Sequence, residues 1–225
     1  MPSLIWQSPV RKLSYKKFKS WYCGLVERPP PTPPYSHIIQ IGDPLLRTIS
    51  EPVIVQQIKS SDTRYVVNAL KSVMKQYDCV GLSAPQIGVA LRIVILEFNS
   101  KHAKSYTKEE LFHKQIDLLP QTVIINPELK ILDYTKVIQV EGCQSVKGYV
   151  ADVPRYQQVE VTGFNENGDQ FSLKLNGWSA RIIQHEIDHL NGKIFTDIMD
   201  RKSLACSCWQ VVNEKRGKVE IPFSP

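Results

Sequence analysis

The feature that most constrains this chain is the segment 178–192, where His185-Glu186-x-x-His189 stands inside an apolar pattern of helical period. On an α-helix, residues four apart share one face with Cβ atoms about 6 Å apart, so His185 and His189 can bind one metal ion together. Glu186 does not lie in the row of the helix that His185 and His189 share, so it cannot bind the ion together with them. It flanks the ion instead and can take a proton from a water molecule that the metal activates. The motif therefore predicts a metalloenzyme.

The alternative interpretation of this segment is two histidines that share a buried helix face by chance, because five-residue motifs recur. Three isoleucines and Leu190 already supply apolar packing, so the histidines are not needed to fill a core. Asn176 is a candidate N-cap and Gly192 a candidate C′ stop. We therefore expect one helix between Asn176 and Gly192.

Two histidines are an incomplete ligand set, because catalytic metal sites usually take three protein ligands and leave one position open. Metzincin proteases would place a third histidine where this chain has Phe195, which excludes that family. Thermolysin-like proteases need a downstream glutamate, and Glu214 and Glu220 are poor candidates because both lie in a charged tail. The third ligand is therefore expected upstream.

The upstream candidate is Cys143, in the segment Glu141-Gly-Cys143-Gln-Ser-Val-Lys-Gly148. The segment follows the β-like run 136–140, and its two glycines free the backbone around a single cysteine, whose thiolate is a metal ligand. A lone cysteine is more often a small buried hydrophobic residue. By itself, this segment leaves both interpretations open.

A third segment, Gly81-Leu-Ser-Ala-Pro85-Gln86-Ile-Gly88, stands between an apolar-periodic helix and a strand. In this order, the three segments resemble the motifs of the peptide deformylase family: Gly-Leu-x-Ala-Pro-Gln-x-Gly, Glu-Gly-Cys-x-Ser-Val and Gln-His-Glu-x-Asp-His-Leu-x-Gly. The resemblance extends from Ile39 to Asp200, and its pattern looks like the animal mitochondrial branch. Three ordered motifs are far more specific than His-Glu-x-x-His alone.

The resemblance implies a metal-dependent hydrolase that removes the N-formyl group from the N-terminal formyl-methionine of newly synthesised mitochondrial polypeptides and releases formate. Glu186 would act as general base and then as general acid. The side chain of Gln86 and the backbone N–H of Gln144 would stabilise the oxygen of the tetrahedral intermediate. The metal would be held by Cys143, His185 and His189.

The resemblance also implies how the substrate and the metal are bound. The substrate backbone would pair with Val80 and Gly81, where a glycine lets another backbone approach closely. A helix stop after Asp78 is a second interpretation of this glycine, compatible with the first. The methionine side chain would lie against Trp178 and Ile182. The expected metal is Fe²⁺, with Zn²⁺, Co²⁺ or Ni²⁺ as alternatives, because a Cys-His₂ ligand set suits all of them.

Four positions depart from the common bacterial pattern. Gln144 and Lys147 stand where leucine and proline are usual, and Trp178 and Arg181 stand where bacterial members tend to be aliphatic. A backbone N–H does not depend on its own side chain, so Gln144 keeps its oxyanion donor, although a polar side chain could alter its direction. The departures therefore bear on catalytic efficiency rather than on identity.

Length and cysteine content limit the organisation of the chain. Its 225 residues, 42% of them hydrophobic, suffice for one well-packed domain with appendages. The five cysteines show no disulfide framework spacing, which indicates a reducing compartment. Cys206-x-Cys208 has no neighbouring His or Cys to complete a metal site, so we interpret this pair as structural or incidental.

Residues 1–36 are expected to be a mitochondrial presequence that ends in the Pro-rich linker 29–34. Residues 1–28 contain six basic residues and one acidic residue, and so carry +5 of the chain's net charge of +6. The nearly neutral remainder argues against direct nucleic-acid binding, and no apolar stretch predicts a membrane span. We expect the mitochondrial matrix; a disordered basic tail on a cytosolic protein is the alternative.

The rest of the chain is predicted to be α+β, with small antiparallel or mixed β-sheets packed around a central helix that carries the metal-binding motif. The catalytic domain should span 37–200, and 201–225 should form a C-terminal helix or tail that contacts the mitochondrial ribosome. Asn167-Gly168 indicates a hairpin. We expect helices over 62–77 and near 199–209, a polar surface excursion over 100–118, and strands near 89–97, 121–126, 129–133, 136–140, 146–151, 156–163 and 170–175.

Two other functions remain open at this point. A metallopeptidase or another deacylase would use the same water activation, because the metal and Glu186 do not by themselves select a formamide over a peptide bond. The width of the acyl pocket distinguishes them, since a formyl group presents hydrogen where an acetyl group presents methyl. A catalytically weak metal-binding module is the third possibility, and the intact Glu186 argues against it.

Overall fold

The structure, a computed structural model, describes residues 31–225. Nearly all of the expected presequence, and Cys23 with it, lies outside these residues, so the import signal stays a prediction. Within the described residues, no helix is both long enough and apolar enough to cross a membrane.

Helix α2 (Ser61–Tyr77) forms where the sequence predicts a helix over 62–77. Ser60 caps it by accepting a hydrogen bond from the Thr63 N–H, and Asp62 lies at the positive end of the helix dipole. Apolar residues recur every three or four positions along the helix and are buried. The helix ends at Asp78, which is left-handed with a φ of 50°.

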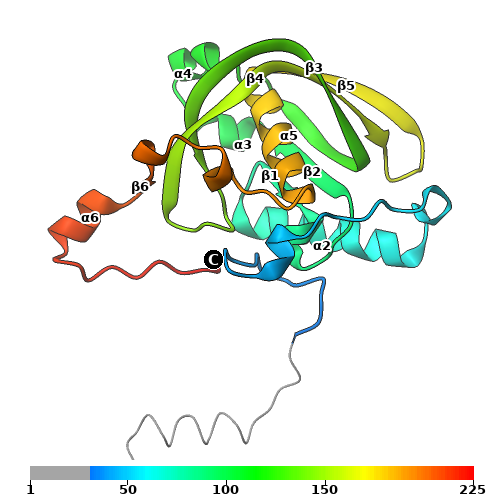
Figure 1. Cartoon of the computed structure of the whole chain (residues 1–225), viewed down its shortest axis with the longest axis horizontal. Coiled ribbons are helices and arrows are strands. Elements are labelled where there is room, and N and C mark those ends of the chain that lie inside the picture. Colours follow the sequence, from blue (N-terminus) through cyan, green and yellow to red (C-terminus); the bar gives the residue numbers. More distant parts are fainter. Residues whose placement is uncertain (1–30) are drawn as a thin grey trace, which may run out of the picture. The chain divides into compact units, whose positions relative to one another are not determined.

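The described residues also form one six-stranded antiparallel sheet (Figure 1). Neighbouring strands follow the order β1-β2-β3-β4-β5, and β6 pairs with β4. The expected small antiparallel or mixed sheets are therefore a single antiparallel sheet, whose first edge strand is β1. The strands are β1 (Gly81–Ser83), β2 (Ile93–Phe98), β3 (Leu119–Gly142), β4 (Tyr149–Phe164), β5 (Gln170–Asn176) and β6 (Ala205–Cys206).

The prediction of five short strands between 121 and 163 was wrong, because β3 and β4 run through the predicted breaks. The pairing register of β3 with β4 shifts between Ile125 and Glu128 and twice more between Ile131 and Lys136. Asn126-Pro127 is thus an irregularity within β3 and not a strand end. Bulges use the same residue types as turns, and they bend a strand without ending it.

Helix α5 (Gly177–Leu190) carries the His-Glu-x-x-His motif and lies inside the curve of β3, β4 and β5 (Figure 1). Its predicted ends are confirmed: Asn176 is the N-cap, without a side-chain hydrogen bond, and Gly192 follows the helix with a φ of 68°. The apolar face of α5 and the sheet share one buried cluster, which includes Leu96, Val161 and Ile183.

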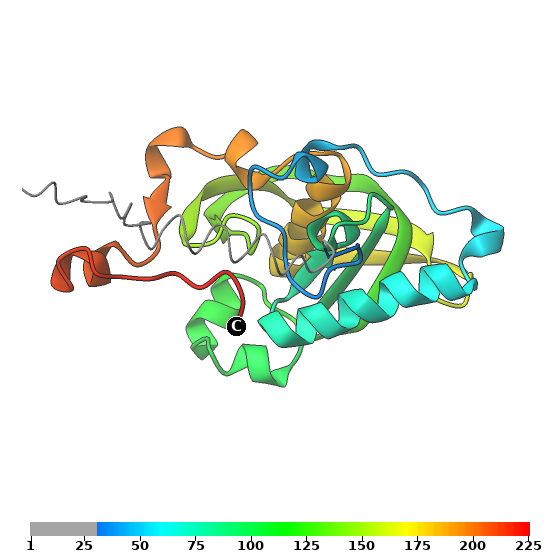
Figure 2. The same cartoon turned by 90° about the horizontal axis from the view of Figure 1, so that it is seen from below.

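The segment 100–118 lies on the surface, as predicted, but it contains two short helices, α3 (Ser100–Ala103) and α4 (Lys108–His113). Both begin with a capping box. Figure 2 shows them beside the C-terminal end of α2, where Lys101 forms an ion pair with Asp78 at 2.8 Å. These helices were missed because each is too short for a periodic pattern to be read.

The predicted helix near 199–209 was also wrong. Arg201–Ser203 forms one 3₁₀ turn, β6 pairs with the free edge of β4 opposite Tyr149 and Val150, and helix α6 (Trp209–Glu214) begins only afterwards. The backbone N–H and C=O groups at the edge of a strand are open to pairing with another extended segment. A helix cannot pair in this way, because its own backbone groups already bond within the helix. The chain past Asp200 therefore contributes to the sheet, and its division from the domain stays a prediction.

A third buried cluster supports the loop that follows β3. It consists of Val146, Ala151, Val153, Ile194 and Phe195, and Cys143 packs against it. The ring of Phe195 is fully buried, whereas that of Phe112 on α4 is 79% exposed. The position of Cys143 therefore depends on core packing behind it.

We predict that Phe195→Ala lowers the free energy of unfolding by about 3–5 kcal/mol, because the substitution leaves a cavity in a packed core. Denaturant unfolding followed by circular dichroism measures the change. Phe112→Ala is the matched control and should change the same quantity by less than about 0.5 kcal/mol. Equal destabilisation of both variants would contradict the prediction.

Candidate active site

Three metal-ligand side chains meet where β3 ends beside α5. Cys143 follows β3 directly, and His185 and His189 lie one turn apart on the helix. Sγ of Cys143 is 3.2 Å from Nε2 of His189, and the ligand atoms of all three residues lie within 4.8 Å of one another. One thiolate and two imidazoles at this spacing suit a zinc, cobalt, nickel or iron ion.

The surroundings of Cys143 favour its thiolate form, which is the form that binds metals. Burial alone raises the pKa of the thiol, but the neighbouring His189 and His185 outweigh burial and hold that pKa well below its usual value. The donor set of this chain therefore fits a divalent metal both in spacing and in charge.

Glu141 orients His185 from outside the ligand set. Its Oε2 lies 3.1 Å from Nδ1 of His185, which leaves Nε2 of the ring available for a metal. Arg155 donates two hydrogen bonds to Glu141, at 2.9 and 3.0 Å, and Arg181 donates one at 2.7 Å. The four side chains come from three separate elements, β3, β4 and α5, so the folded structure alone brings them together.

The hydrogen bonds of Glu141 keep it ionised. Burial raises the pKa of Glu141, but the bonds with His185 and Arg155 outweigh burial and lower the pKa from 4.5 to about 2. Because the folded-state pKa is depressed, the stability that this carboxylate contributes is complete above its ordinary pKa and is lost only as the pH falls towards 2.

The sequence analysis assigned no role to this network. Arg155 is 5% exposed and also pairs with Asp188 of α5. A signal was available, because Ala151, Val153 and Arg155 alternate on the inward face of β4, where an unpaired charge would be very unfavourable. An arginine at an inward strand position predicts a buried acidic partner.

Glu186 is a buried carboxylate beside the ligand set, 3% exposed. Its Oε2 has no hydrogen-bond partner among the described residues. Burial raises the pKa of Glu186 by more than the neighbouring His185 and His189 lower it. A carboxylate with a raised pKa and a free oxygen can exchange a proton with a group in the pocket.

Gly81 lies against this carboxylate. A Cβ added at Gly81 would be 2.5 Å from Oε1 of Glu186 and 2.7 Å from Cγ2 of Ile182, so no side chain fits there. Asp78 is the residue that ends α2, and Gly81 belongs to β1, the edge strand of the sheet. The glycine therefore lets β1 pack tightly on α5, and it leaves a backbone edge open to the pocket.

The amide of Gln86 is held in one orientation. Its Oε1 accepts hydrogen bonds from both the N–H and the hydroxyl of Ser83, each at 2.9 Å. Its Nε2 is thereby turned towards Ser145 Oγ at 3.2 Å and Cys143 Sγ at 3.6 Å. The sequence analysis missed Ser83 and Ser145, although both belong to the motifs that it quoted.

The side chain and the carbonyl of Gln144 bond to residues outside the ligand set. The carbonyl accepts a hydrogen bond from Gln40 at 2.8 Å, and the side-chain oxygen accepts one from Lys147 at 3.0 Å. Among the described residues, none accepts a hydrogen bond from the Gln144 N–H. The two polar departures from the bacterial pattern thus bond to each other and leave this backbone donor available.

These groups surround a pocket of about 430 Å³. Trp178 forms part of its apolar wall, and the ammonium of Lys114 lies 5.7 Å from the centre of the Trp178 ring. His189 lies beneath the lining, 1% exposed. The other nine residues that the sequence analysis assigned to the site line the pocket: Val80, Gly81, Gln86, Cys143, Gln144, Trp178, Ile182, His185 and Glu186.

Comparisons with known proteins agree with this geometry. The family model for polypeptide deformylase matches residues 35–205. The mitochondrial peptide deformylase of Homo sapiens is 40% identical over 185 residues, which are 82% of this chain and 76% of that protein.

Solved structures are similar as well. A crystal structure of peptide deformylase from Ehrlichia chaffeensis matches with a TM-score of 0.63 and 28% identity, over 80% of this chain and 96% of that one. A Met-Ala-Ser-bound class I type b peptide deformylase from Acinetobacter baumannii matches with a TM-score of 0.63 and 26% identity, over 72% and 96%. With its three ordered motifs, its metal-ligand set and these matches, the chain belongs to the polypeptide deformylase family.

Proposed function

We propose that this peptide deformylase acts in the mitochondrial matrix on the N-terminal formyl-methionine of newly made polypeptides, with Fe²⁺ as its metal. The observation that carries the proposal is the buried carboxylate of Glu186 beside Cys143, His185 and His189 in one pocket. Similarity to the human mitochondrial enzyme supports the location. The basic N-terminal region supports import on sequence grounds.

The roles of the residues follow from their positions. The metal, when bound by Cys143, His185 and His189, supplies a Lewis acid that makes water nucleophilic near neutral pH. Glu186 accepts the proton that the attacking water loses. It returns the proton to the methionine nitrogen as the bond between that nitrogen and the formyl carbon breaks, and formate and a free amine are the products.

Two donors face the oxygen that becomes negative during the attack. Nε2 of Gln86 is oriented by Ser83, and the N–H of Gln144 is held by the bond from Gln40 to the Gln144 carbonyl. Donors fixed before the reaction stabilise the transition state without reorganisation, and each is typically worth about 10²–10³ in rate. We assign both to the oxyanion.

The substrate backbone lies along the open edge at Val80 and Gly81, and the methionine side chain lies against Trp178 and Ile182. The edge strand supports this path, because an extended peptide can pair with an open strand edge. The Acinetobacter baumannii relative binds Met-Ala-Ser, a peptide that begins with methionine. Iron is proposed over zinc, cobalt and nickel from the family resemblance, and the ligand set suits each of them.

The first test is the reaction itself. Protein beginning near Tyr35, purified without oxygen and loaded with Fe²⁺ or Co²⁺, should release formate from formyl-Met-Ala-Ser and no acetate from acetyl-Met-Ala-Ser. The two peptides differ only in that an acetyl group carries a methyl group where a formyl group carries hydrogen, so the pair tests the width of the acyl pocket directly. Cleavage inside either peptide would instead support a metallopeptidase.

We predict that Glu186→Gln lowers kcat/KM for the formyl peptide by at least about 10²-fold, because the amide has the same size but cannot accept the proton. Metal content, measured by mass spectrometry, should stay unchanged. Glu214→Gln, the same exchange on α6, is the matched control and should keep full activity. Loss of metal from Glu186→Gln would show a structural role in place of proton transfer.

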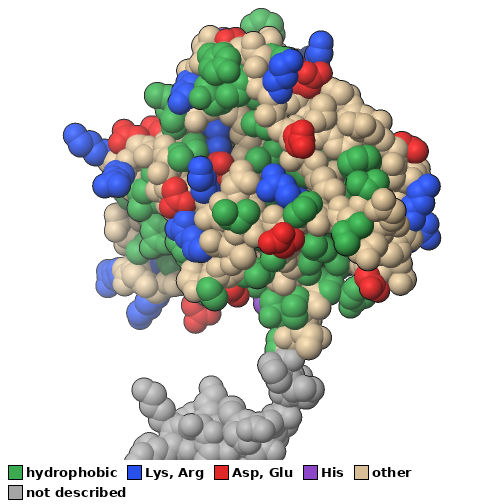
Figure 3. Space-filling model, turned by 45° about the vertical axis from the view of Figure 1, so that its right-hand side comes forward, with side chains coloured by type: hydrophobic (Ala, Val, Ile, Leu, Met, Phe, Trp, Pro, Cys, Tyr) green, Lys and Arg blue, Asp and Glu red, His purple; other side chains and the backbone are tan. Residues whose placement is uncertain are grey.

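The ribosome is the proposed macromolecular partner of the C-terminal region. Five basic residues follow Asp200, against two acidic ones, and Trp209 is 52% exposed. On the face that Figure 3 shows, positive and negative side chains are interspersed, which offers no broad basic surface there. Contact with the ribosome is therefore proposed for the C-terminal region alone.

Truncation after Ser207 tests this contact, because it keeps β6 paired with β4 while it removes α6 and the residues beyond. We predict that the truncated protein loses co-sedimentation with mitochondrial ribosomes. Unfolding measurements should show an intact domain. Unchanged co-sedimentation would rule out this part of the proposal.

A further inference from the structure

We infer that the C-terminal segment 218–225 restricts the path of the substrate chain beyond the methionine, and that it thereby gives the enzyme a preference for short formyl peptides. The inference rests on the proposed substrate path along Val80 and Gly81. It concerns a segment outside the three motifs, to which neither the reaction nor the ligand set assigns a role.

The substrate chain must leave the pocket between two walls. We take Asp78 and Cys79, which lead into β1, as one wall of this exit, and Gly148 and Tyr149 at the start of β4, together with Ser207, as the other; all five residues line the pocket. A peptide whose formyl end reaches Glu186 and whose methionine lies beside Trp178 has to continue outward between them. Any segment that spans both walls lies beside this path.

The C-terminal segment makes contacts on both sides. The Cδ1 atom of Ile221 lies only 2.8 Å from the position that a Cβ on Gly148 would take, so Ile221 packs directly on that glycine. On the other side, the Tyr77 hydroxyl donates a hydrogen bond to the Phe223 carbonyl at 3.2 Å. Tyr77 directly precedes Asp78, so the segment reaches from one wall to the other.

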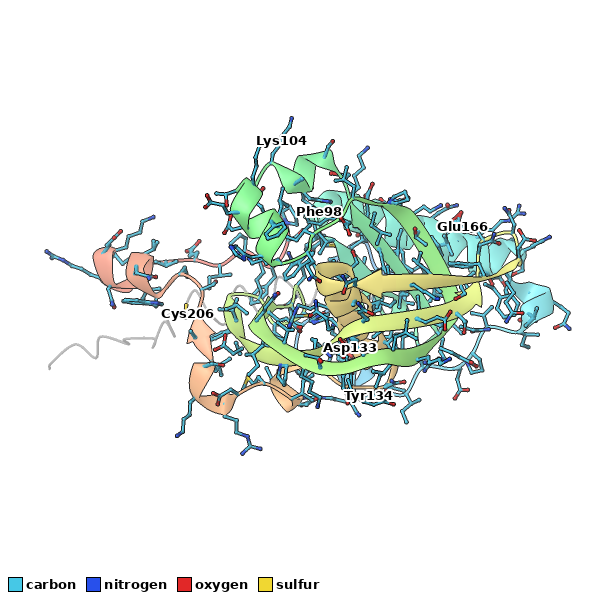
Figure 4. The ribbon with its side chains drawn as sticks, turned by 90° about the horizontal axis from the view of Figure 1, so that it is seen from above. Phe98, Lys104, Asp133, Tyr134, Glu166 and Cys206 are labelled. Carbon is cyan, nitrogen blue, oxygen red and sulfur yellow. The ribbon has the colours of Figure 1, made fainter. Side chains whose placement is uncertain are left out.

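Both ends of the stretch from Ser207 to Ile221 contact Gly148. The N–H and the hydroxyl of Ser207 both donate to the Gly148 carbonyl, at 2.9 and 3.2 Å. From there the chain passes through α6 and comes back to place Ile221 on Gly148. Figure 4 shows Cys206, the neighbour of Ser207, at the end of the sheet from which this excursion starts. Figure 1 shows the segment after α6 turning back towards the body of the domain.

The contact is weak enough to open. The two contacts described above are one hydrogen bond and the packing of one apolar side chain, and the ring of Phe223 is 60% exposed. On the proposed path, a dipeptide ends before it reaches the segment. A longer substrate has to displace the segment, so its effective binding is reduced by the fraction of molecules in which the segment is closed.

The experiment compares two substrates on the metal-loaded full chain. They are formyl-Met-Ala and formyl-Met-Ala-Ser-Ala-Ser-Ala, and the readout is the ratio of kcat/KM for the longer to that for the shorter peptide. Removal of residues 219–225, and separately Ile221→Asp, should each raise this ratio by about fivefold, which corresponds to about 1 kcal/mol. Val211→Asp adds the same charge to α6, away from the contact, and should leave the ratio unchanged.

Other outcomes overturn the inference. An equal change for both peptides would show that the segment acts by supporting the loop 143–148, whatever the length of the substrate. A lower ratio after removal would show that the segment helps to bind long substrates, and an unchanged ratio would show that it lies clear of them. Failure of the unmodified enzyme to deformylate even the dipeptide would contradict the proposed function itself, and it is recognisable because it does not depend on length.

Discussion

The buried carboxylate of Glu141 is the interaction on which the site depends. It belongs to the end of β3, and it is bound by Arg155 from β4 and by Arg181 and His185 from α5. A buried charge is tolerated only when it is paired, and removal of one partner typically costs about 3–5 kcal/mol because the other charge is left uncompensated. The same contacts that hold two strands on the central helix therefore also fix the orientation of a metal-ligating imidazole.

Two glutamates in this small volume have opposite environments, which supports the opposite roles that we propose for them. Glu141 is surrounded by hydrogen-bond donors, and its pKa falls to about 2, so it stays ionised and structural. Glu186 is buried without a partner for Oε2, and its pKa is raised. Carboxylates whose pKa values are pushed apart in this way identify which one moves protons. The proposal that Glu186 is the base thus rests on its surroundings as well as on its motif.

The shape of the sheet explains why the pocket is open on one side. β3 and β4 bend through their bulges around α5, which brings the end of β3 and its Cys143 onto the helix. β1 remains an edge strand whose Gly81 touches Glu186, so the open edge and the proton acceptor are adjacent. The C-terminal segment then lies across the outer part of this opening, where a long substrate would pass.

The features predicted correctly from the sequence are the local ones. The pairing of His185 with His189 follows from a spacing of four on a helix, and the ends of α5 follow from Asn176 and Gly192. The ordered motifs also indicated the family and the grouping of Cys143 with the two histidines. A helix needs only neighbours within four residues, so its signals lie within a short stretch of sequence.

The tertiary structure alone decided which distant residues pair. It joined the predicted short strands into β3 and β4, attached β6 to the sheet, and brought Gln40 to Gln144, which lies 104 residues further along the chain. It also placed Arg181 on Glu141, 40 residues away. Strand pairing and buried ion pairs depend on partners that the local sequence does not specify, because burial, which makes an unpaired polar group unfavourable, arises only when the chain has folded.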